Sequence, residues 1–211
     1  MSDKLTTKEQ LELALENYSV AISFYEGKGY STLNSALLGL LKEARRENGR
    51  LLLSLNELTL ASLAVRNLFE IYLIFKHVYS DEKALFSWFG QSHKDSKEVT
   101  DGFITLMEKK GLDTAELQEI QKFEDVSLEQ SPFQSKGGFQ VRNLAEKYGC
   151  LDDYQFIYKL SSKLIHPSSM KVMAYDTLTE NTNYLSVVLQ TGVYFSQEFS
   201  LFLQTVIHEN A

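Results

Sequence analysis

The chain contains few of the residues that interrupt helices. Its 211 residues include only two prolines, Pro132 and Pro167, and 11 glycines. Because proline removes a backbone donor and glycine is entropically costly inside a helix, their scarcity permits long helices over nearly the whole length. A hydrophobic content of 44% suffices to bury a substantial core in one domain. We therefore expect an all-α fold, a single-domain helical bundle spanning residues 1–211.

Cysteine is also scarce and several functional motifs are absent, which excludes several classes of protein. The one cysteine, Cys150, cannot form an internal disulfide, and without a nearby histidine it favours an inert, packed thiol. No His, Cys or Asp cluster has metal-ligand spacing, and neither a glycine-rich phosphate loop nor a Gly-x-Ser-x-Gly elbow occurs. We therefore expect no metal and no cofactor. The polar first 18 residues lack a signal-peptide core, which favours the cytoplasm and no membrane span.

Positive charge is sparse as well. The formal net charge is −7, and no dense Lys/Arg block would attract a phosphate backbone across the whole surface. A small basic group, formed by Lys42, Arg45, Arg46 and Arg50, is interpreted as a solvated helix end rather than a phosphate site. Binding of nucleic acid would therefore require a local site.

The most distinctive segment is an apolar helix that carries charges. Residues 51–79 are mostly apolar but include Arg66, Glu70 and His77, which fall within roughly 40° of one another at about 100° per residue. An unpaired ion in a core costs several kcal/mol, so this polar stripe must be paired, hydrated or facing a cavity. It is the first candidate for a functional site.

Helical spacing of apolar residues predicts further elements. Helices are expected over residues 7–27, 31–47, 97–109, 113–123, 139–148, 152–165 and 183–208, with a short helix after Asp81. Residues 91–96 are predicted to form a loop, and residues 127–138 a longer one that could act as a mobile lid. The aromatic residues of the long last helix favour core or a dimer face. Within that helix, Glu198 should lean to solvent beside Gln197, the alternative being that it faces the central polar stripe.

A second polar pattern precedes Pro167. Tyr154, Tyr158, Ser162 and His166 recur every four residues and form a ridge of hydroxyls that ends in an imidazole at the helix C-terminus. The helix dipole there favours the imidazolium form. His166 could therefore carry a positive charge or form hydrogen bonds at this helix end at little energetic cost.

Together these patterns resemble a known family. Arg-x3-Glu at residues 66–70, followed by Tyr-x3-Ser-x3-His at residues 158–166, is similar to a bacterial helical family of unknown function within or near the HEPN-like grouping. The resemblance covers residues 51–78 and 154–168, and it implies a helical bundle. Several HEPN-like proteins are metal-independent ribonucleases in toxin/antitoxin or phage-defence systems, whereas others only bind nucleotides, RNA or partner proteins such as antitoxins. The nucleases carry an arginine before the histidine, where this chain has Lys159 before His166, and lysine lacks the bidentate fork of arginine.

Two hypotheses about function follow. In the first, the two patterns meet and bind RNA, a nucleotide or another phosphorylated ligand, with metal-independent ribonuclease activity as one form of this function. Arg66 would hold the anion, Glu70 would orient Arg66 or act as a base, and His166 would act as general acid or base. Four further residues would contact the ligand: Tyr158, Ser162, Lys159 and His77. In the second hypothesis, the ion network is structural and the chain is a non-catalytic, homodimeric interaction module.

Overall fold

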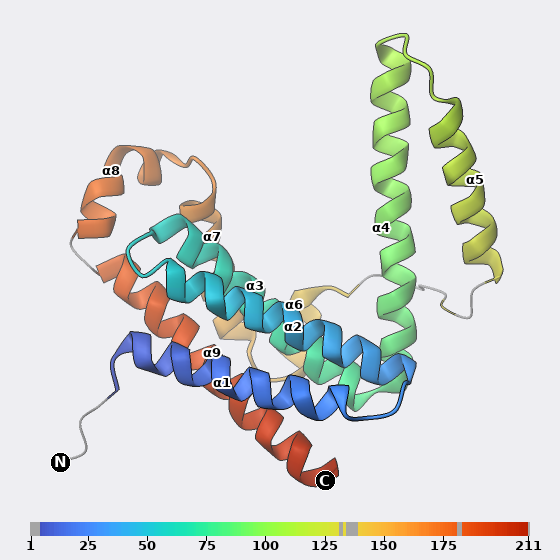
Figure 1. Cartoon of the computed structure of the whole chain (residues 1–211). Coiled ribbons are helices and arrows are strands. Elements are labelled where there is room, and N and C mark those ends of the chain that lie inside the picture. Colours follow the sequence, from blue (N-terminus) through green and yellow to red (C-terminus); the bar gives the residue numbers. More distant parts are fainter. Residues whose placement is uncertain (1–4, 131–132, 134–138, 181–182, 211) are drawn as a thin grey trace. The chain divides into compact units, whose positions relative to one another are not determined.

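The computed structural model describes residues 5–130, 133, 139–180 and 183–210, and this part of the chain is helical without strands. The helices are α1 Thr7–Glu26, α2 Thr32–Leu53, α3 Leu58–Ser80, α4 Glu82–Lys109, α5 Ala115–Gln130, α6 Val141–Lys147, α7 Leu151–Ile165, α8 Ser169–Glu180 and α9 Asn183–Asn210 (Figure 1). The predicted all-α fold is confirmed.

The chain forms two compact units. Residues 1–76 and 141–211 make the first unit, and residues 77–140 make the second. The expectation of one domain stays a prediction.

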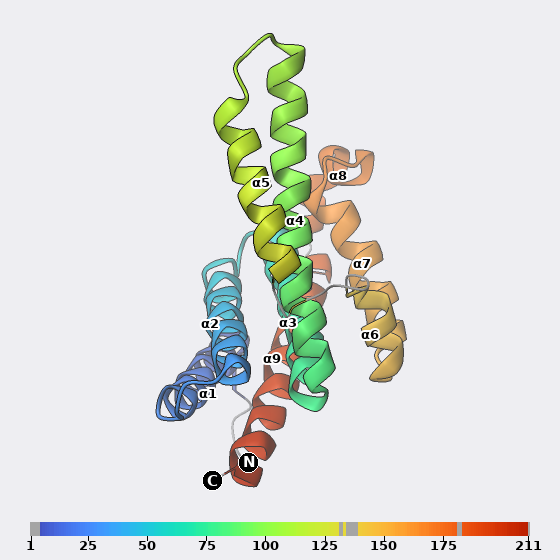
Figure 2. The ribbon, with the colours of Figure 1, turned by 90° about the vertical axis from the view of Figure 1, so that its right-hand side faces the viewer.

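In the first unit, α1 lies along α2 and also packs on α9 (Figures 1 and 2). The N-cap of α1 is Thr6, whose side chain forms a capping box with Glu9. A buried amide joins the three helices: Asn48 donates to the Leu11 carbonyl at 2.8 Å and accepts from the Ser196 hydroxyl at 2.6 Å. This network fixes the register of α1, α2 and α9.

The predicted helix over residues 51–79 is divided between two elements. Helix α2 runs past Gly49 to Leu53, and the chain turns at residues 54–57 before α3 begins. Glu57 stabilises the new start because its carboxylate accepts from the amides of Thr59 and Leu60 at 3.3 and 2.5 Å. The single-helix prediction was therefore wrong over its first turns.

Helix α3 is the core helix of the first unit. Of the described helices, it alone has the length and apolar composition to cross a membrane, but 61% of its most apolar window is buried inside the protein. Its aromatic side chains pack edge to face on α9, with ring centroids 4.8 Å apart for Phe69 and Phe195 and 5.1 Å apart for Phe75 and Phe199. Both phenylalanines of α9 are buried. The core interpretation of these α9 aromatics is therefore confirmed.

Helices α6, α7 and α8 complete the first unit. Gly149 separates α6 from α7 with a φ of 72°, in the left-handed region that favours glycine. Helix α7 ends just before Pro167, as predicted. Helix α8 has no counterpart among the predicted elements, and Tyr175 attaches it to the start of α3 by donating to Glu57 at 2.9 Å.

The second unit is built around a helical hairpin of α4 and α5. The loop predicted at residues 91–96 was wrong, because these polar residues lie inside α4 and contain neither proline nor glycine. Helix α4 ends at Lys109, as predicted, and Gly111 follows it with a φ of 68°, in the left-handed region. Helix α5 extends to Gln130, beyond the predicted end, and most of the proposed lid lies outside the described residues.

Candidate functional site

Three predicted site residues meet between α3 and α7. The Nε of Arg66 donates to Glu70 Oε1 at 3.0 Å, and the Tyr158 hydroxyl donates to the same carboxylate oxygen. The guanidinium carbon of Arg66 lies 4.1 Å from the centre of the Tyr158 ring, which places the cation over the aromatic face. The two polar patterns in the sequence therefore join at this cluster, which we call the Arg66 cluster.

The Arg66 cluster is only partly buried. The side chains of Arg66 and Glu70 retain 30% and 27% of their exposure. Beyond Glu70 and Tyr158, Arg66 has no hydrogen-bond or ion-pair partner among the described residues. Its Nε and one face are thus fixed by the protein, while 30% of the side chain stays exposed. The terminal nitrogens of its guanidinium could donate two parallel hydrogen bonds to a phosphate or carboxylate.

The electrostatic environment of the cluster determines the protonation states of Arg66 and Tyr158. Burial alone would lower the pKa of the Arg66 guanidinium, but the hydrogen bond and charge of Glu70 outweigh it, so this pKa is raised. Burial also raises the pKa of Tyr158, and the neighbouring Glu70 carboxylate adds to the effect. At neutral pH, therefore, Arg66 is a cation and Tyr158 a neutral hydrogen-bond donor.

The remaining candidates on α7 lie away from this cluster. Lys159, Ser162 and His166 are exposed, and their side chains make no hydrogen bond or ion pair with the described residues. His166 lies eight residues beyond Tyr158, which corresponds to about 12 Å along the helix axis. The two side chains would therefore contact different parts of a ligand, and the roles assigned to them stay predictions.

His77 belongs to the second unit. Its ring packs on Phe139, with ring centroids 5.0 Å apart. Its assignment as a ligand-binding residue also stays a prediction.

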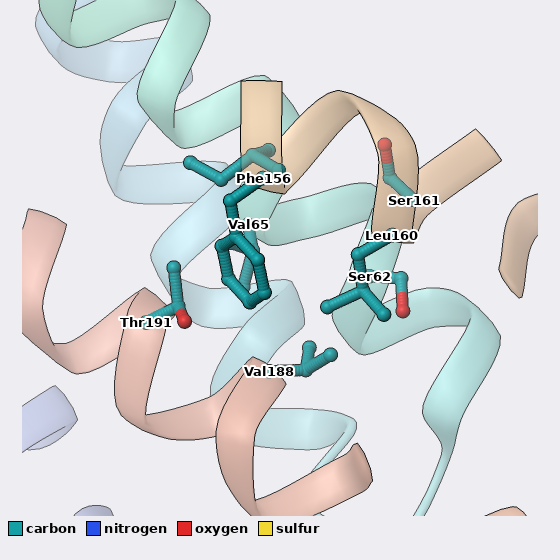
Figure 3. A pocket seen from close by; sticks show the side chains of 8 residues that line it. Ser62, Val65, Phe156, Leu160, Ser161, Val188 and Thr191 are labelled. Carbon is teal, nitrogen blue, oxygen red and sulfur yellow. The ribbon is translucent and has the colours of Figure 1, made fainter. Parts of the chain in front are cut away.

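A small cavity lies between α3, α7 and α9 (Figure 3), and its lining includes Val65 and Ile157, the chain neighbours of Arg66 and Tyr158. Its volume is about 10 Å³, which is room for roughly one water molecule. Val65, Phe156 and Leu160 contribute apolar walls, and the nearby Ser62 hydroxyl is already bonded to the Leu58 carbonyl at 2.6 Å. A nucleotide cannot enter this space, so any ligand of Arg66 would lie on the surface.

A buried carboxylate that sequence reasoning missed lies at the contact between α2 and α3. Glu47 is 2% exposed; its Oε1 accepts from Asn67 at 3.1 Å and pairs with Arg50. Its Oε2 is buried and has no hydrogen-bond partner among the described residues. Burial raises the pKa of Glu47 although Asn67 and Arg50 oppose the shift. Sequence reasoning missed this burial because Glu47 lies in a polar run, residues 42–50.

A second group of titratable side chains surrounds Lys76. Its ammonium lies 3.3 Å from the Tyr72 hydroxyl and 5.1 Å from the centre of the Tyr148 ring. Burial raises the pKa of Tyr72, and the charge of half-buried Glu198 adds to the shift. Glu198 is therefore half-buried near Tyr72, which lies about 120° around α3 from Arg66 and so off the predicted polar stripe. Burial also raises the pKa of the Cys150 thiol, in keeping with an inert cysteine.

The basic group on α2 forms a groove with α1. Lys42, Arg45 and Arg46 line a space of about 410 Å³ together with serines of α1. Lys42 pairs with Glu26 at 2.8 Å and Arg46 pairs with Glu43, so two of the three cations are already neutralised. The arrangement fits the predicted solvated helix face. Arg45, which donates to Ser19 at 3.1 Å, has no carboxylate partner among the described residues.

Comparison with known proteins identifies a family but no function. Among the described residues, no group of three or more His, Cys, Asp and Glu side chains could hold a metal ion. No curated protein and no solved structure matches the chain significantly. A family model, described as a family of unknown function (DUF5677), matches residues 51–184, a range that contains all three members of the Arg66 cluster. The chain therefore belongs to this family of unknown function.

Proposed function

We propose that the chain is a cytoplasmic, HEPN-like accessory or defence-associated protein that binds the phosphate of RNA or a nucleotide at the Arg66 cluster. The observation that carries this proposal is the state of Arg66, whose Nε is held by Glu70 and whose face rests on Tyr158 while 30% of its side chain stays exposed. An arginine fixed in this way loses little conformational entropy when it binds an anion.

The chemistry of the cluster suits RNA better than a free anion. Glu70 neutralises much of the charge of Arg66, so a single phosphate would bind weakly. A polynucleotide adds contacts along its backbone, and the exposed Lys159 and His166, which come after Tyr158 in the chain, could supply some of them. The resemblance to HEPN-like proteins, several of which act on RNA, supports the same ligand class.

The test is RNA binding by charge-matched variants, measured by fluorescence anisotropy with a labelled single-stranded oligoribonucleotide. Arg66→Gln removes the fork and should weaken binding about 10-fold or more. Glu70→Gln retains an oxygen that can accept from Arg66 and Tyr158 but removes the negative charge, so it should strengthen binding. Arg46→Gln is the control, because it removes an exposed, paired cation on α2. Circular dichroism melting establishes that each variant is folded.

The outcomes separate the proposal from a purely structural network. Opposite changes for Arg66→Gln and Glu70→Gln support a ligand site at this cluster. Equal affinity in all variants, or no RNA binding by the folded wild type, would contradict it. Loss of binding only in Arg45→Gln would place the ligand in the groove between α1 and α2.

Ribonuclease activity is a separate element of the proposal. If His166 acts as general acid or base, the wild type degrades RNA with all metal chelated, and folded His166→Ala does not. If the wild type binds RNA but leaves it intact, the function is RNA binding without cleavage. The alternative, a non-catalytic interaction module, is favoured by the exposed apolar side chains of α4 and α5.

A further inference from the structure

The hairpin of α4 and α5 lacks a core of its own. Between residues 91 and 130, Thr114 is the only described side chain that is buried, and every described apolar side chain there stays at least partly exposed. An isolated pair of helices must bury an apolar stripe against another element to be stable. The hairpin therefore needs a partner surface.

The contact between the two helices is rich in polar pairs. Ser96 donates to Glu124 at 2.6 Å, and Lys97 pairs with Asp125 at 2.6 Å. One turn further on, Gln121 bonds to Asp101. These pairs define the face that each helix turns toward the other. Much of the apolar surface of α4 and α5 therefore lies outside the contact between them.

Most of the exposed apolar side chains of the hairpin fall into one stripe on each helix. On α4, Val99, Phe103 and Leu106 are 60%, 55% and 49% exposed. On α5, Ile120 and Phe123 are 50% and 74% exposed. At about 100° per residue, the α4 stripe lies roughly 140° to one side of the polar contact, and the α5 stripe lies roughly 125° from it.

Because the helices are antiparallel, these two rotations bring both stripes to the same side of the hairpin. The opposite side carries mostly polar or small residues, among them Thr105 on α4 and Ala115 on α5, both exposed, although Val126 of α5, 52% exposed, is an apolar exception. The hairpin thus has one mainly apolar face and one mainly polar face. We call the first the hairpin face, and it consists of Val99, Phe103, Leu106, Ile120 and Phe123.

The size of the hairpin face matches a dimer interface. Its five side chains expose on the order of 500 Å² of apolar surface, since a phenylalanine alone can bury about 150–250 Å². Interfaces are about 60% apolar, so a patch of this size corresponds to roughly 800 Å² per partner, the usual area of a stable complex. A single partner of equal area would cover it.

We infer that the hairpin face is covered by the hairpin face of a second copy of this chain. Two antiparallel helices stacked on two others form a four-helix bundle, and a two-fold axis lets each face bury its own equivalent. This assignment uses none of the residues of the proposed RNA site, so it stands or falls separately from that function.

The experiment measures the mass of the full-length chain by light scattering and by sedimentation equilibrium, at about 1 to 100 μM. The wild type should be a dimer at the higher concentrations. Phe103→Glu with Phe123→Glu should raise the dimer dissociation constant at least about 100-fold, since buried aromatic anchors dominate interfaces. The matched control, Thr105→Glu with Ala115→Glu, adds the same charge to the polar face and should leave the dimer intact.

Hydrogen exchange on the wild type gives an independent result if the phenylalanine variant fails to fold. Amide protection over residues 97–109 and 115–130 should increase with protein concentration. A wild type that is monomeric at the highest concentration, a dimer that persists in the folded phenylalanine variant, or protection that is independent of concentration would each overturn the inference.

Discussion

Gly192 offers a quantitative test of how closely α9 packs against the core. A Cβ added at this position would lie 2.3 Å from Leu51 Cδ2 and 2.9 Å from Val65 Cγ2, both closer than van der Waals contact. Leu51 is fully buried and Val65 is β-branched, so neither side chain can move aside without disturbing its neighbours. The absence of a side chain at Gly192 therefore allows α9 to approach α2 and α3.

Two opposing terms determine the effect of Gly192→Ala. Alanine favours the helix by about 0.8–1.0 kcal/mol over glycine. Overpacking a filled core costs about 1–3 kcal/mol, and the 2.3 Å approach places this site toward the upper end. We expect a net loss of about 1–2 kcal/mol in the free energy of unfolding.

The assay is urea unfolding followed by circular dichroism, with Gly39→Ala as the control. Gly39 is exposed inside α2, and a Cβ there would meet nothing within 4 Å. This control should gain about 0.5–1 kcal/mol. A Gly192→Ala variant as stable as Gly39→Ala would refute the claim of tight packing.

Two further predictions concern buried polar groups. Folding raises the pKa of the Glu47 carboxyl above its usual 4.5, so the folded state binds the carboxyl proton more tightly than the unfolded state does. As pH rises above 4.5 and through the raised pKa, the wild type should therefore lose stability relative to Glu47→Gln. Unfolding at about pH 4 and about pH 7 checks this, and an advantage of the wild type that grows with pH would contradict it. Asn48→Ala leaves two buried partners, the Leu11 carbonyl and the Ser196 hydroxyl, and should cost at least about 2 kcal/mol in urea unfolding. A smaller loss would mean that water replaces the amide.

The helical fold was predictable because apolar periodicity runs almost unbroken along the chain. The division between α2 and α3 was not, because Ser54 to Glu57 contains neither proline nor glycine and lies inside an apolar run. The turn depends instead on Glu57 capping the amides of the next helix. A carboxylate cap of this kind is a local signal that the surrounding hydrophobicity obscures.

The candidate site was predictable only in part. The pairing of Arg66 with Glu70 follows from their i,i+4 spacing, and the sequence shows it directly. The contact of Tyr158 with Glu70 spans 88 residues, and no spacing rule reveals it. The drift of about 40° per four residues explains why His166 lies elsewhere, since it is rotated roughly 80° from Tyr158 around α7.

The most direct test of the central claim follows the arginine side-chain Nε–H signals by NMR while a short single-stranded oligoribonucleotide is added to the full-length chain. If RNA binds at the Arg66 cluster, the Arg66 signal, assigned by its loss in Arg66→Lys, shifts and saturates with RNA while the Arg46 signal stays in place. An Arg66 signal that does not move while RNA is bound would contradict the account, because the ligand would then lie away from the contact between α3 and α7.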